Sequence, residues 1–502
     1  MFNLIKNELT KIFSKKGIYV ILVIFLILEI AGVVINKIIN NMDLEEILYY
    51  GNDEVIAEYE GQLKSIDKST TEGKQEYANI QTELEIMKLI DKYGYDSWQT
   101  TLIYDKLYNI LIDINYYKNG LTEFIYEERT QEELETQYNK IIELFEKDDW
   151  KYFAEEELKD AKEQIKVVEQ KIKETTDINK LTEYKMQKEK LDITIEILEK
   201  RINNNIKYGE DSVLSSYQYS AEELITYRYQ KEVTPDNYKT IKGSEFNFDF
   251  KQYYQDVIER YFISKYKIDN NIFKDTESEN SLVNTLKDNS SRILFIIITA
   301  ILIGGTIVSE EFNKGTIKLL LVRPYNRRKI LFAKIIATFI TILISIVTFL
   351  IITTLVNGIA YGFNSINEPV LIFNYNTNTV ISMNILKYVV VIGIRMAPMI
   401  IILTLLALTC GVILNNSGIA MICSFLVYMG TNIISGIAQL SNVKWLKFIP
   451  TLNWDLTQYL YGKLPLLEGM TITFSLIMCI AVCVILLIIS FENFTRKNIK
   501  NV

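Results

Sequence analysis

Six long apolar runs constrain this chain more than any other feature of its sequence. Each contains about 20 residues with few charges, the length that an α-helix needs to cross the hydrocarbon layer of a bilayer. Because backbone inside lipid has to satisfy its own hydrogen bonds, such runs predict helices. The sequence therefore predicts an all-α membrane protein with six transmembrane helices. The predicted spans are Gly17–Ile38, Ser291–Ser309, Leu331–Asn357, Leu386–Ile413, Gly418–Ala438 and Met470–Phe491.

Basic residues predict the orientation of these spans. Lysines precede the first run, six Lys and Arg residues follow the second between 314 and 329, and three more follow the last. All three groups fall on one side, which the positive-inside rule assigns to the cytoplasm together with both termini. The first run leads into Asn36 without a small-residue cleavage site, so we expect a retained anchor. The segment 358–384, between the third and fourth runs, contains no Lys or Arg, as expected of an outside loop, whereas Lys444, Lys447 and Lys463, between the last two runs, are exceptions to this pattern.

The region 40–289 differs sharply in charge from the rest of the chain. It contains 54 acidic and 33 basic residues, whereas the remainder contains 8 and 21. We expect it to be an extracellular domain between the first two spans. Its charge fits two explanations, the solubility of a long polar domain or the capture of a cationic peptide. All four cysteines lie in predicted spans and histidine is absent, which removes disulfides from this domain and His-based metal sites or catalysis from the chain.

The composition of 40–289 favours helices, because it holds one proline and is rich in Glu, Lys, Leu and Ile. Apolar residues recur every three or four positions from Leu158 to Ile172 and from Leu181 to Ile202. The segment 175–179 between them offers N-cap residues for the second helix. The pattern predicts an antiparallel hairpin that is partly coiled coil, with Lys188 interrupting its apolar seam.

Two shorter segments leave alternatives open. Residues 2–16 place Phe2, Leu9 and Ile12 on one helical face with lysines opposite, which is typical of an interfacial helix; a disordered basic leader is the alternative. The segment from Trp445 to Trp454 fits either a short re-entrant or interfacial helix, or a loop with aromatic residues at the membrane surface.

Two charges interrupt the apolar runs, Glu29 in the first and Arg395 in the fourth. Their estimated depths in the membrane coincide, because the two spans run in opposite directions. Charges at such depth are costly and normally pair or line a wet path. We therefore expect either a Glu29–Arg395 pair, or two separate roles in which Glu29 faces a water-filled route or is protonated and Arg395 extends toward the surface.

A charged segment at 309–330, between the second and third spans, carries a distinctive order of residues. Glu311 is followed by a Gly-Thr step, a leucine run, a proline, an arginine and finally Lys334. This order resembles the cytoplasmic coupling region of type-2 ABC transporter permeases; a generic basic loop is the alternative. The resemblance implies that the segment contacts a separate ATPase. The implied coupling residues are Glu310, Glu311, Gly315, Thr316, Leu320, Leu321, Pro324, Arg327 and Arg328.

The resemblance implies the membrane subunit of a bacterial ABC transporter, working mostly in export or in resistance to peptides and other membrane-active compounds. The chain has no phosphate-binding loop, so ATP and Mg²⁺ would be bound by a dimer of ATPase subunits, and a second permease chain would complete the assembly. We expect no catalytic residue, no metal, no cofactor on this chain and no nucleic-acid partner. The predicted organisation is 1–39, 40–289 and 290–502. The alternatives are a non-transporting membrane anchor with an adhesive or secretion-related ectodomain, and a sensor subunit.

Overall fold

The computed structural model describes residues 1–41, 44–125, 129–233, 250–273, 280–288, 290–316, 326–441, 443–467 and 469–496. The chain folds into two compact units. Unit 1 comprises Met1–Ile35, Tyr238–Ile263 and Thr276–Val502; unit 2 comprises Asn36–Asn237 and Ser264–Asp275. Parts of the region 40–289, expected from composition to be one domain, therefore belong to unit 1, and helix α11 (Phe250–Asp269) contains residues of both units.

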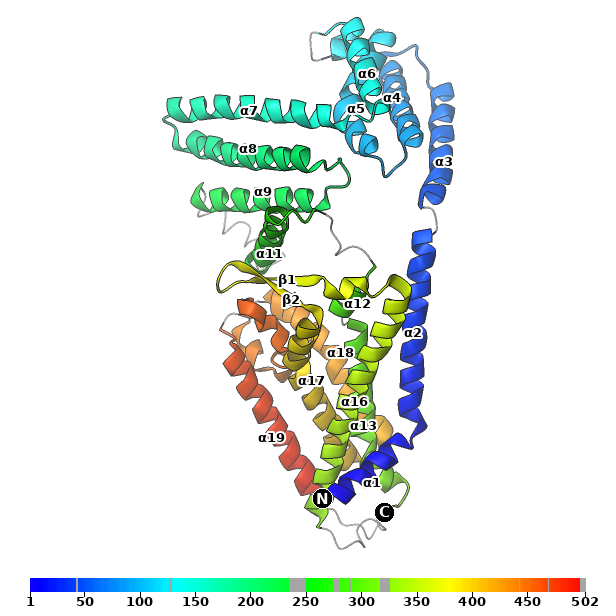
Figure 1. Cartoon of the computed structure of the whole chain (residues 1–502), viewed down its shortest axis with the longest axis vertical. Helices are drawn as coiled ribbons and strands as arrows, with labels where there is room; N and C mark the ends of the chain where they lie inside the picture. The colour runs from blue at the N-terminus through cyan, green and yellow to red at the C-terminus, as the bar shows by residue number, and fades with distance from the viewer. Residues whose placement is uncertain are drawn as a thin grey trace. The chain divides into compact units, whose positions relative to one another are not determined.

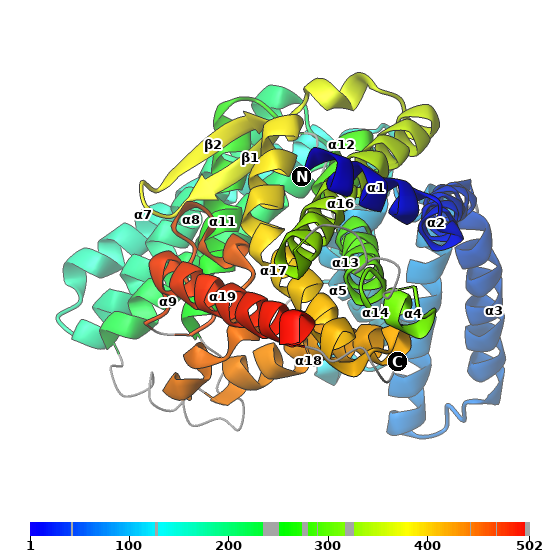
Figure 2. The same ribbon diagram turned by 90° about the horizontal axis from the view of Figure 1, so that it is seen from below.

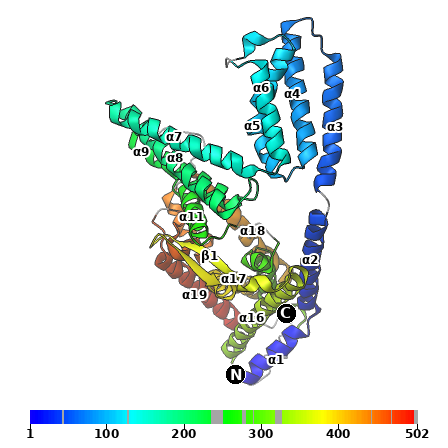
Figure 3. The same ribbon diagram turned by 45° about the horizontal axis from the view of Figure 1, so that its top comes forward.

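Unit 2 is built from helices whose starts are specified locally. Side chains of Thr70, Ser97, Thr130, Asp149 and Asp177 accept hydrogen bonds from the first turn of the helices that follow them. These helices pack in sequence order, and Figure 3 shows the first four side by side. They are α3 (Leu44–Ser65), α4 (Thr71–Tyr93), α5 (Trp98–Lys118), α6 (Gln131–Glu146), α7 (Trp150–Glu174), α8 (Ile178–Asn204) and α9 (Ser212–Val233).

The predicted helical hairpin is confirmed by α7 and α8, which lie side by side in Figure 1 and are joined by the three residues 175–177. The charge of Lys188 in the apolar seam is paired, because its Nζ lies 3.3 Å from Glu169 of α7 and 3.2 Å from Asp192 of α8. Helix α9 packs on the other side of α8. Supercoiling of the two arms stays a prediction.

In the described part of the chain, six helices are long and apolar enough to cross a membrane, as the sequence predicts, and they lie in unit 1 except for the last residues of the first, which belong to unit 2. Their bounds are Lys16–Ile39, Leu282–Asn313, Arg327–Tyr361, Ile385–Leu414, Ser417–Ala438 and Ile472–Arg496. They correspond to α2 (Lys16–Asn41), α12 to α14 (Leu282–Lys287, Ser290–Thr306 and Ser309–Asn313), α16 (Arg327–Tyr361), α17 (Ile385–Leu414), α18 (Ser417–Ser441) and α19 (Ile472–Arg496).

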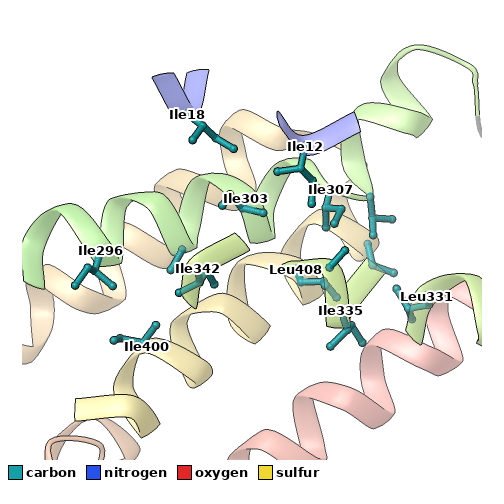
Figure 4. Close-up of a cluster of buried hydrophobic side chains, with 14 of the residues drawn as sticks. Ile12, Ile18, Ile296, Ile303, Ile307, Leu331, Ile335, Ile342, Ile400 and Leu408 are labelled. Carbon is teal, nitrogen blue, oxygen red and sulfur yellow. The ribbon is translucent and has the colours of Figure 1, made fainter. Parts of the chain in front are cut away.

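Helices α13 and α17 form the centre of these spans. Helix α17 contacts α13, α18 and α19, which surround it in Figure 2. Glycines allow the approach: a Cβ on Gly304 of α13 would lie 2.6 Å from the carbonyl oxygen of Thr404 in α17. Buried isoleucines and leucines from α1, α2, α13, α16 and α17 fill the space beside this contact, as the labelled side chains in Figure 4 show. Lipid is as apolar as a helix surface, so the hydrophobic effect does not drive helices together there. Close packing at small residues stabilises the contact between α13 and α17 instead.

A β-hairpin is an addition to the predicted all-α fold. Strands β1 (Pro369–Asn374) and β2 (Thr379–Asn384) pair antiparallel between α16 and α17, where we expected a loop. One face of the hairpin, with Val370, Ile372 and Met383, packs against α12. Phe373 of β1 stacks on Phe262 of α11 with ring centroids 4.7 Å apart, and Tyr375 donates a 2.7 Å hydrogen bond to Glu259. The hairpin therefore fixes the unit 1 half of α11.

The aromatic segment between α18 and α19 forms short 3-10 helices, at Lys444–Phe448, Pro450–Leu452 and Leu456–Gly462. Trp454 is buried against α13 and α17, whereas Trp445 is exposed. The structure thus favours a short helical segment over a plain loop, and its position in a membrane stays a prediction.

Candidate functional site

Lys334 is the centre of the site because its charge is enclosed within unit 1. The residue lies in the first third of α16 and has no exposed surface. Its Nζ lies 2.7 Å from Glu8 Oε2 and 2.9 Å from Glu311 Oε1, and it donates a 3.1 Å hydrogen bond to the carbonyl oxygen of Ile307. An ammonium group at such a place needs carboxylate partners, since an unpaired buried charge is strongly unfavourable.

Lys11 closes the arrangement into a ring of four charges. Its Nζ lies 3.1 Å from Glu8 Oε1 and 2.9 Å from Glu311 Oε1, the two carboxylates that also contact Lys334. Glu8 and Lys11 belong to α1 (Phe2–Phe13), Glu311 to α14 and Lys334 to α16. We call these four residues the charge cluster. It joins α1 to α14 and α16, from which α1 is far removed in the sequence.

Helix α1 carries its half of the charge cluster on a buried face. Leu4, Glu8 and Ile12 are all buried in α1, at helical spacing. Ile5 and Leu9 pack beside them against the core shown in Figure 4. The predicted helix at residues 2–16 is therefore confirmed, but its apolar face contacts protein, mainly α16, and Glu8 enters the interior with it.

A second, outer layer of ion pairs surrounds the charge cluster. Lys15 lies 3.2 Å from Glu310 and donates a 3.3 Å hydrogen bond to Thr306, while Lys314 lies 3.3 Å from the same Glu310. These groups are more exposed, so each pair stabilises the fold by less than those of Lys334. Together they tie the start of α2 to α14.

The surroundings shift the pKa values of the α1 charges. Burial by itself raises the pKa of Glu8, but Lys334 and Lys11 outweigh it and hold that pKa below its usual value. Burial lowers the pKa of Lys11, yet its contacts with Glu311 and Glu8 prevail and raise it. For Lys15 burial prevails over the contact with Glu310, and the pKa is lowered. Glu8 and Lys11 are therefore held in their charged forms.

A pocket of about 370 Å³ opens beside the charge cluster. Its lining comes from α1, the end of α13 and α14, and includes the exposed Lys314 and Thr316. The Oε2 atom of Glu311 is buried and accepts no hydrogen bond from the described part of the chain. The pocket thus offers charges of both signs to a partner.

Few of the predicted coupling residues lie in or next to the charge cluster. Glu311 is in it, and Glu310 is in the outer layer. Gly315 has a φ of +66° after α14, and the Thr316 hydroxyl donates to the Glu311 carbonyl at 3.4 Å. Glycine suits that backbone conformation, which larger residues adopt only with strain.

The remaining predicted coupling residues lie elsewhere. Arg327 donates a 3.0 Å hydrogen bond to the Thr495 carbonyl and so ties the start of α16 to the end of α19, while Arg328 is exposed. Leu320, Leu321 and Pro324 lie outside the described residues. The segment is therefore spread over α14 and α16, and the described part of it meets the charge cluster only at Glu311.

Sequence reasoning missed Glu8 and Lys11, and left Lys334 as the last residue of a pattern. One signal was available for Glu8, which is the only acidic residue before the first span and stands three residues before Lys11. That spacing places two side chains next to each other on a helix. Nothing in the sequence links them to Lys334.

The predicted Glu29–Arg395 pair is wrong. Glu29 accepts hydrogen bonds from Thr353 at 3.3 Å and Asn357 at 2.9 Å, both in α16. Arg395 lies in α17, and its Nη1 atom is buried without a hydrogen-bond partner in the described residues. Equal depth did not bring the two together, because α2 presents Phe25 and Glu29 to α13 and α16. Phe25 contacts Phe295 and Phe349 there, with ring centroids 5.0 and 4.7 Å apart.

Comparison with known proteins finds one family model, which matches the C-terminal half, and two relatives. The profile of a family described as "Protein of unknown function (DUF2705)" matches residues 255–500. "Uncharacterized protein YhcI" of Bacillus subtilis (strain 168) is 29% identical over 274 residues, which are 54% of this chain and 85% of that protein. "Uncharacterized membrane protein YdbK" of the same organism is 28% identical over 225 residues, 44% of this chain and 85% of that protein. No solved structure matches.

These matches agree with the six apolar helices in indicating a membrane protein. Glu311 and Lys334 lie inside the matched range 255–500, whereas Glu8 and Lys11 lie outside it. Most of unit 2 also lies outside that range.

Proposed function

We propose that this chain is the membrane permease subunit of an ABC-type transporter in a bacterial cell membrane, driven by a separate ATPase. The observation that carries the proposal is the charge cluster, in which Glu311 and Lys334, the two ends of the permease-like pattern, form a buried ion pair. The chain has no phosphate-binding loop of its own, so hydrolysis belongs to a partner chain. A second permease chain and a dimer of ATPase subunits complete the proposed assembly.

The charge cluster suits the transmission of force from a partner to the spans. Separating Lys334 from Glu8 and Glu311 leaves an unpaired charge in the interior, which in buried pairs costs roughly 3 to 5 kcal/mol. Helices α1, α14 and α16 therefore move together more easily than apart. A partner that binds α14 and the pocket beside it would displace α16, and with α16 the other spans. We propose that the ATPase binds there, on the cytoplasmic side.

Co-purification tests this proposal. The full chain is tagged and purified from bacterial membranes, a co-purifying ATPase is identified by mass spectrometry, and the complex is assayed for ATP turnover. Glu311→Gln keeps the shape of the side chain but removes its charge, and we expect it to reduce turnover about tenfold while the permease still enters the membrane. Glu492→Gln, at an exposed position of α19, is the matched control and keeps wild-type turnover. Equal turnover in all three proteins would contradict the proposal.

The orientation is a second element of the proposal. Both termini are cytoplasmic and unit 2 is extracellular, because the basic residues flank the spans on one side. Ile178 lies at the exposed tip of the α7–α8 hairpin. In a chain whose four native cysteines are replaced by alanine, Ile178→Cys should react with an impermeant maleimide on intact cells, whereas Asn3→Cys should react only after lysis. The reverse pattern would overturn the orientation.

Substrates of the proposed transporter are cationic, membrane-active compounds such as peptides, to which it would confer resistance by export. The acidic balance of 40–289 supports this choice. The main alternative is a membrane anchor or sensor with a helical ectodomain, which has no need of a buried ion pair between α14 and α16. An anchor would tolerate Glu311→Gln without loss of any partner.

A further inference from the structure

A chain of polar groups crosses the interior of unit 1 away from the charge cluster. The Glu29 carboxylate of α2 accepts hydrogen bonds from Thr353 and Asn357 of α16. The side-chain oxygen of Asn357 accepts a 3.5 Å hydrogen bond from Thr285 of α12. Arg292 of α13 donates to the carbonyl oxygens of Thr285, at 3.0 Å, and Leu286, at 2.6 Å. Four helices, all within the observed apolar spans, thus contribute to one polar group.

The charge of Glu29 has no cation in contact with it among the described residues. Its two donors, Thr353 and Asn357, are neutral and buried. Arg292 attracts Glu29 electrostatically, but its guanidinium is buried and bonded to backbone carbonyls. A carboxylate has about four positions that accept hydrogen bonds, and these two neutral donors fill only two of them. The site therefore has room for a cationic donor.

Glu29 is accessible from the lipid side. The side chain is half-buried, and the residues beside it on α2, including Leu28 and Ile30, are exposed apolar groups. Thr353 and Asn357 form the buried floor behind it. Glu29 lies about 20 Å along α2 from Lys16, inside an apolar layer of about 30 Å. A molecule that reaches this carboxylate thus arrives from within the bilayer.

We infer that Glu29, Thr353 and Asn357 form a binding site for the ammonium group of a membrane-embedded amphiphile. An ammonium group supplies three N–H donors and the opposite charge, and such charge-assisted hydrogen bonds are strong where water is scarce. The apolar chain of the same molecule would lie along the exposed residues of α2. A neutral headgroup gains only a hydrogen bond, and an anionic one is repelled. The inference rests on the proposed function for the transport step, whereas binding itself needs no ATPase.

Equilibrium binding to the full chain alone tests the site. The protein is placed in nanodiscs of phosphatidylcholine, and binding of tritiated dodecylamine is compared with that of tritiated dodecanol, with empty nanodiscs subtracting partition into lipid. We expect saturable binding of the amine that is at least tenfold tighter than that of the alcohol. Glu29→Gln should weaken amine binding about tenfold or more and leave the alcohol unchanged. Glu368→Gln, which removes an exposed carboxylate from the loop before β1, should behave as wild type.

Equal affinity for amine and alcohol, or unchanged amine binding in Glu29→Gln, would overturn the inference and leave Glu29 as a structural link between α2 and α16. The preference for the amine is measured on the wild-type chain, so the inference can fail even if Glu29→Gln does not fold. Replacing half of the phosphatidylcholine by phosphatidylethanolamine identifies the source. Loss of dodecylamine binding would assign the site to a native aminophospholipid, and retention to a single-chain amine. Loss of ATPase co-purification would leave these results unaffected.

Discussion

The two units of this chain are both mainly helical, but they distribute polar and apolar residues oppositely between interior and surface. In unit 2 the interior is apolar, with Ile103, Leu107 and Phe153 almost fully buried, and the surface carries ion pairs such as Lys88–Glu60 and Lys92–Glu146. In unit 1 the surface is apolar, and Ile359 is 79% exposed, while Lys334 is fully buried.

The two units differ in the type of residue that marks a helix contact in the sequence. In water, burial of apolar area drives association, so apolar periodicity marks the interior. Between helices in lipid that drive is missing, and small or polar residues mark the contacts instead. The functional candidates of unit 1 are therefore its polar interior groups.

The largest expected effect is that of Lys334→Met. It leaves two carboxylates, Glu8 and Glu311, with the single positive charge of Lys11, so one buried negative charge is uncompensated, and we expect a loss of stability of roughly 3 to 5 kcal/mol. The measurement is the yield of monodisperse protein in mild detergent and its thermal midpoint. Lys329→Met, at an exposed position of the same helix, is the matched control. Adding Glu8→Gln to Lys334→Met should recover part of the loss. If the single variants of Lys334 and Lys329 behave alike, the interior of unit 1 does not depend on the charge cluster.

A slightly smaller effect is expected from truncating an aromatic core residue of unit 2. Phe153 packs with Trp98 and Phe145, at ring-centroid distances of 6.0 and 5.6 Å. Phe153→Ala should destabilise unit 2 by about 3 to 4 kcal/mol through lost burial and a cavity. Phe332→Ala changes the same side chain at a position of α16 that is 47% exposed, and should have little effect. Denaturant unfolding of the full chain, followed by tryptophan fluorescence, gives both values. Similar losses would remove the contrast between the units.

Close helix contact in unit 1 is tested by Gly304→Val. The new Cβ would meet the Thr404 carbonyl oxygen at 2.6 Å, so α13 and α17 have to move apart, at a cost of about 1 to 3 kcal/mol. Gly393→Val is the matched control, because nothing lies within 4 Å of a Cβ there. The thermal midpoint in detergent reports the difference. Equal midpoints would mean that α13 and α17 are separated more easily than this contact indicates.

The smallest effect is the pH dependence of the charge cluster. The pKa of Glu8 is lowered in the folded chain, so its contribution is present above its ordinary pKa and is lost as pH falls through the lowered one. The pKa of Lys11 is raised, so its contribution is complete below its ordinary pKa and is lost as pH rises through the raised one. Thermal midpoints of wild type and Glu8→Gln should therefore differ at neutral pH and converge in acid. A constant difference down to pH of about 3 would argue against the Glu8 ion pairs.

Local physical chemistry was sufficient to predict several elements from the sequence. The fourth span was predicted as Leu386–Ile413 and found as Ile385–Leu414, because an uninterrupted apolar run has one stable form in lipid. The hairpin of α7 and α8 was predicted from apolar periodicity, and Asp177 caps α8 as its position suggested. The β-hairpin was missed because the lack of basic residues at 358–384 favoured an outside loop. The residues of β1 and β2 nevertheless include many β-branched and aromatic side chains, which favour strands.

The sequence by itself therefore determined that this chain has six apolar helices, an acidic helical region after the first of them, and a charged segment before the third. Only the tertiary structure decided that Lys334 meets Glu8, 326 residues away, and that Glu29 meets Asn357 and not Arg395. The physical reason is that apolarity and capping act over a few residues, whereas the pairing of two side chains depends on how each helix is rotated about its axis. That rotation is fixed by packing, such as the approach of α13 to α17 at Gly304.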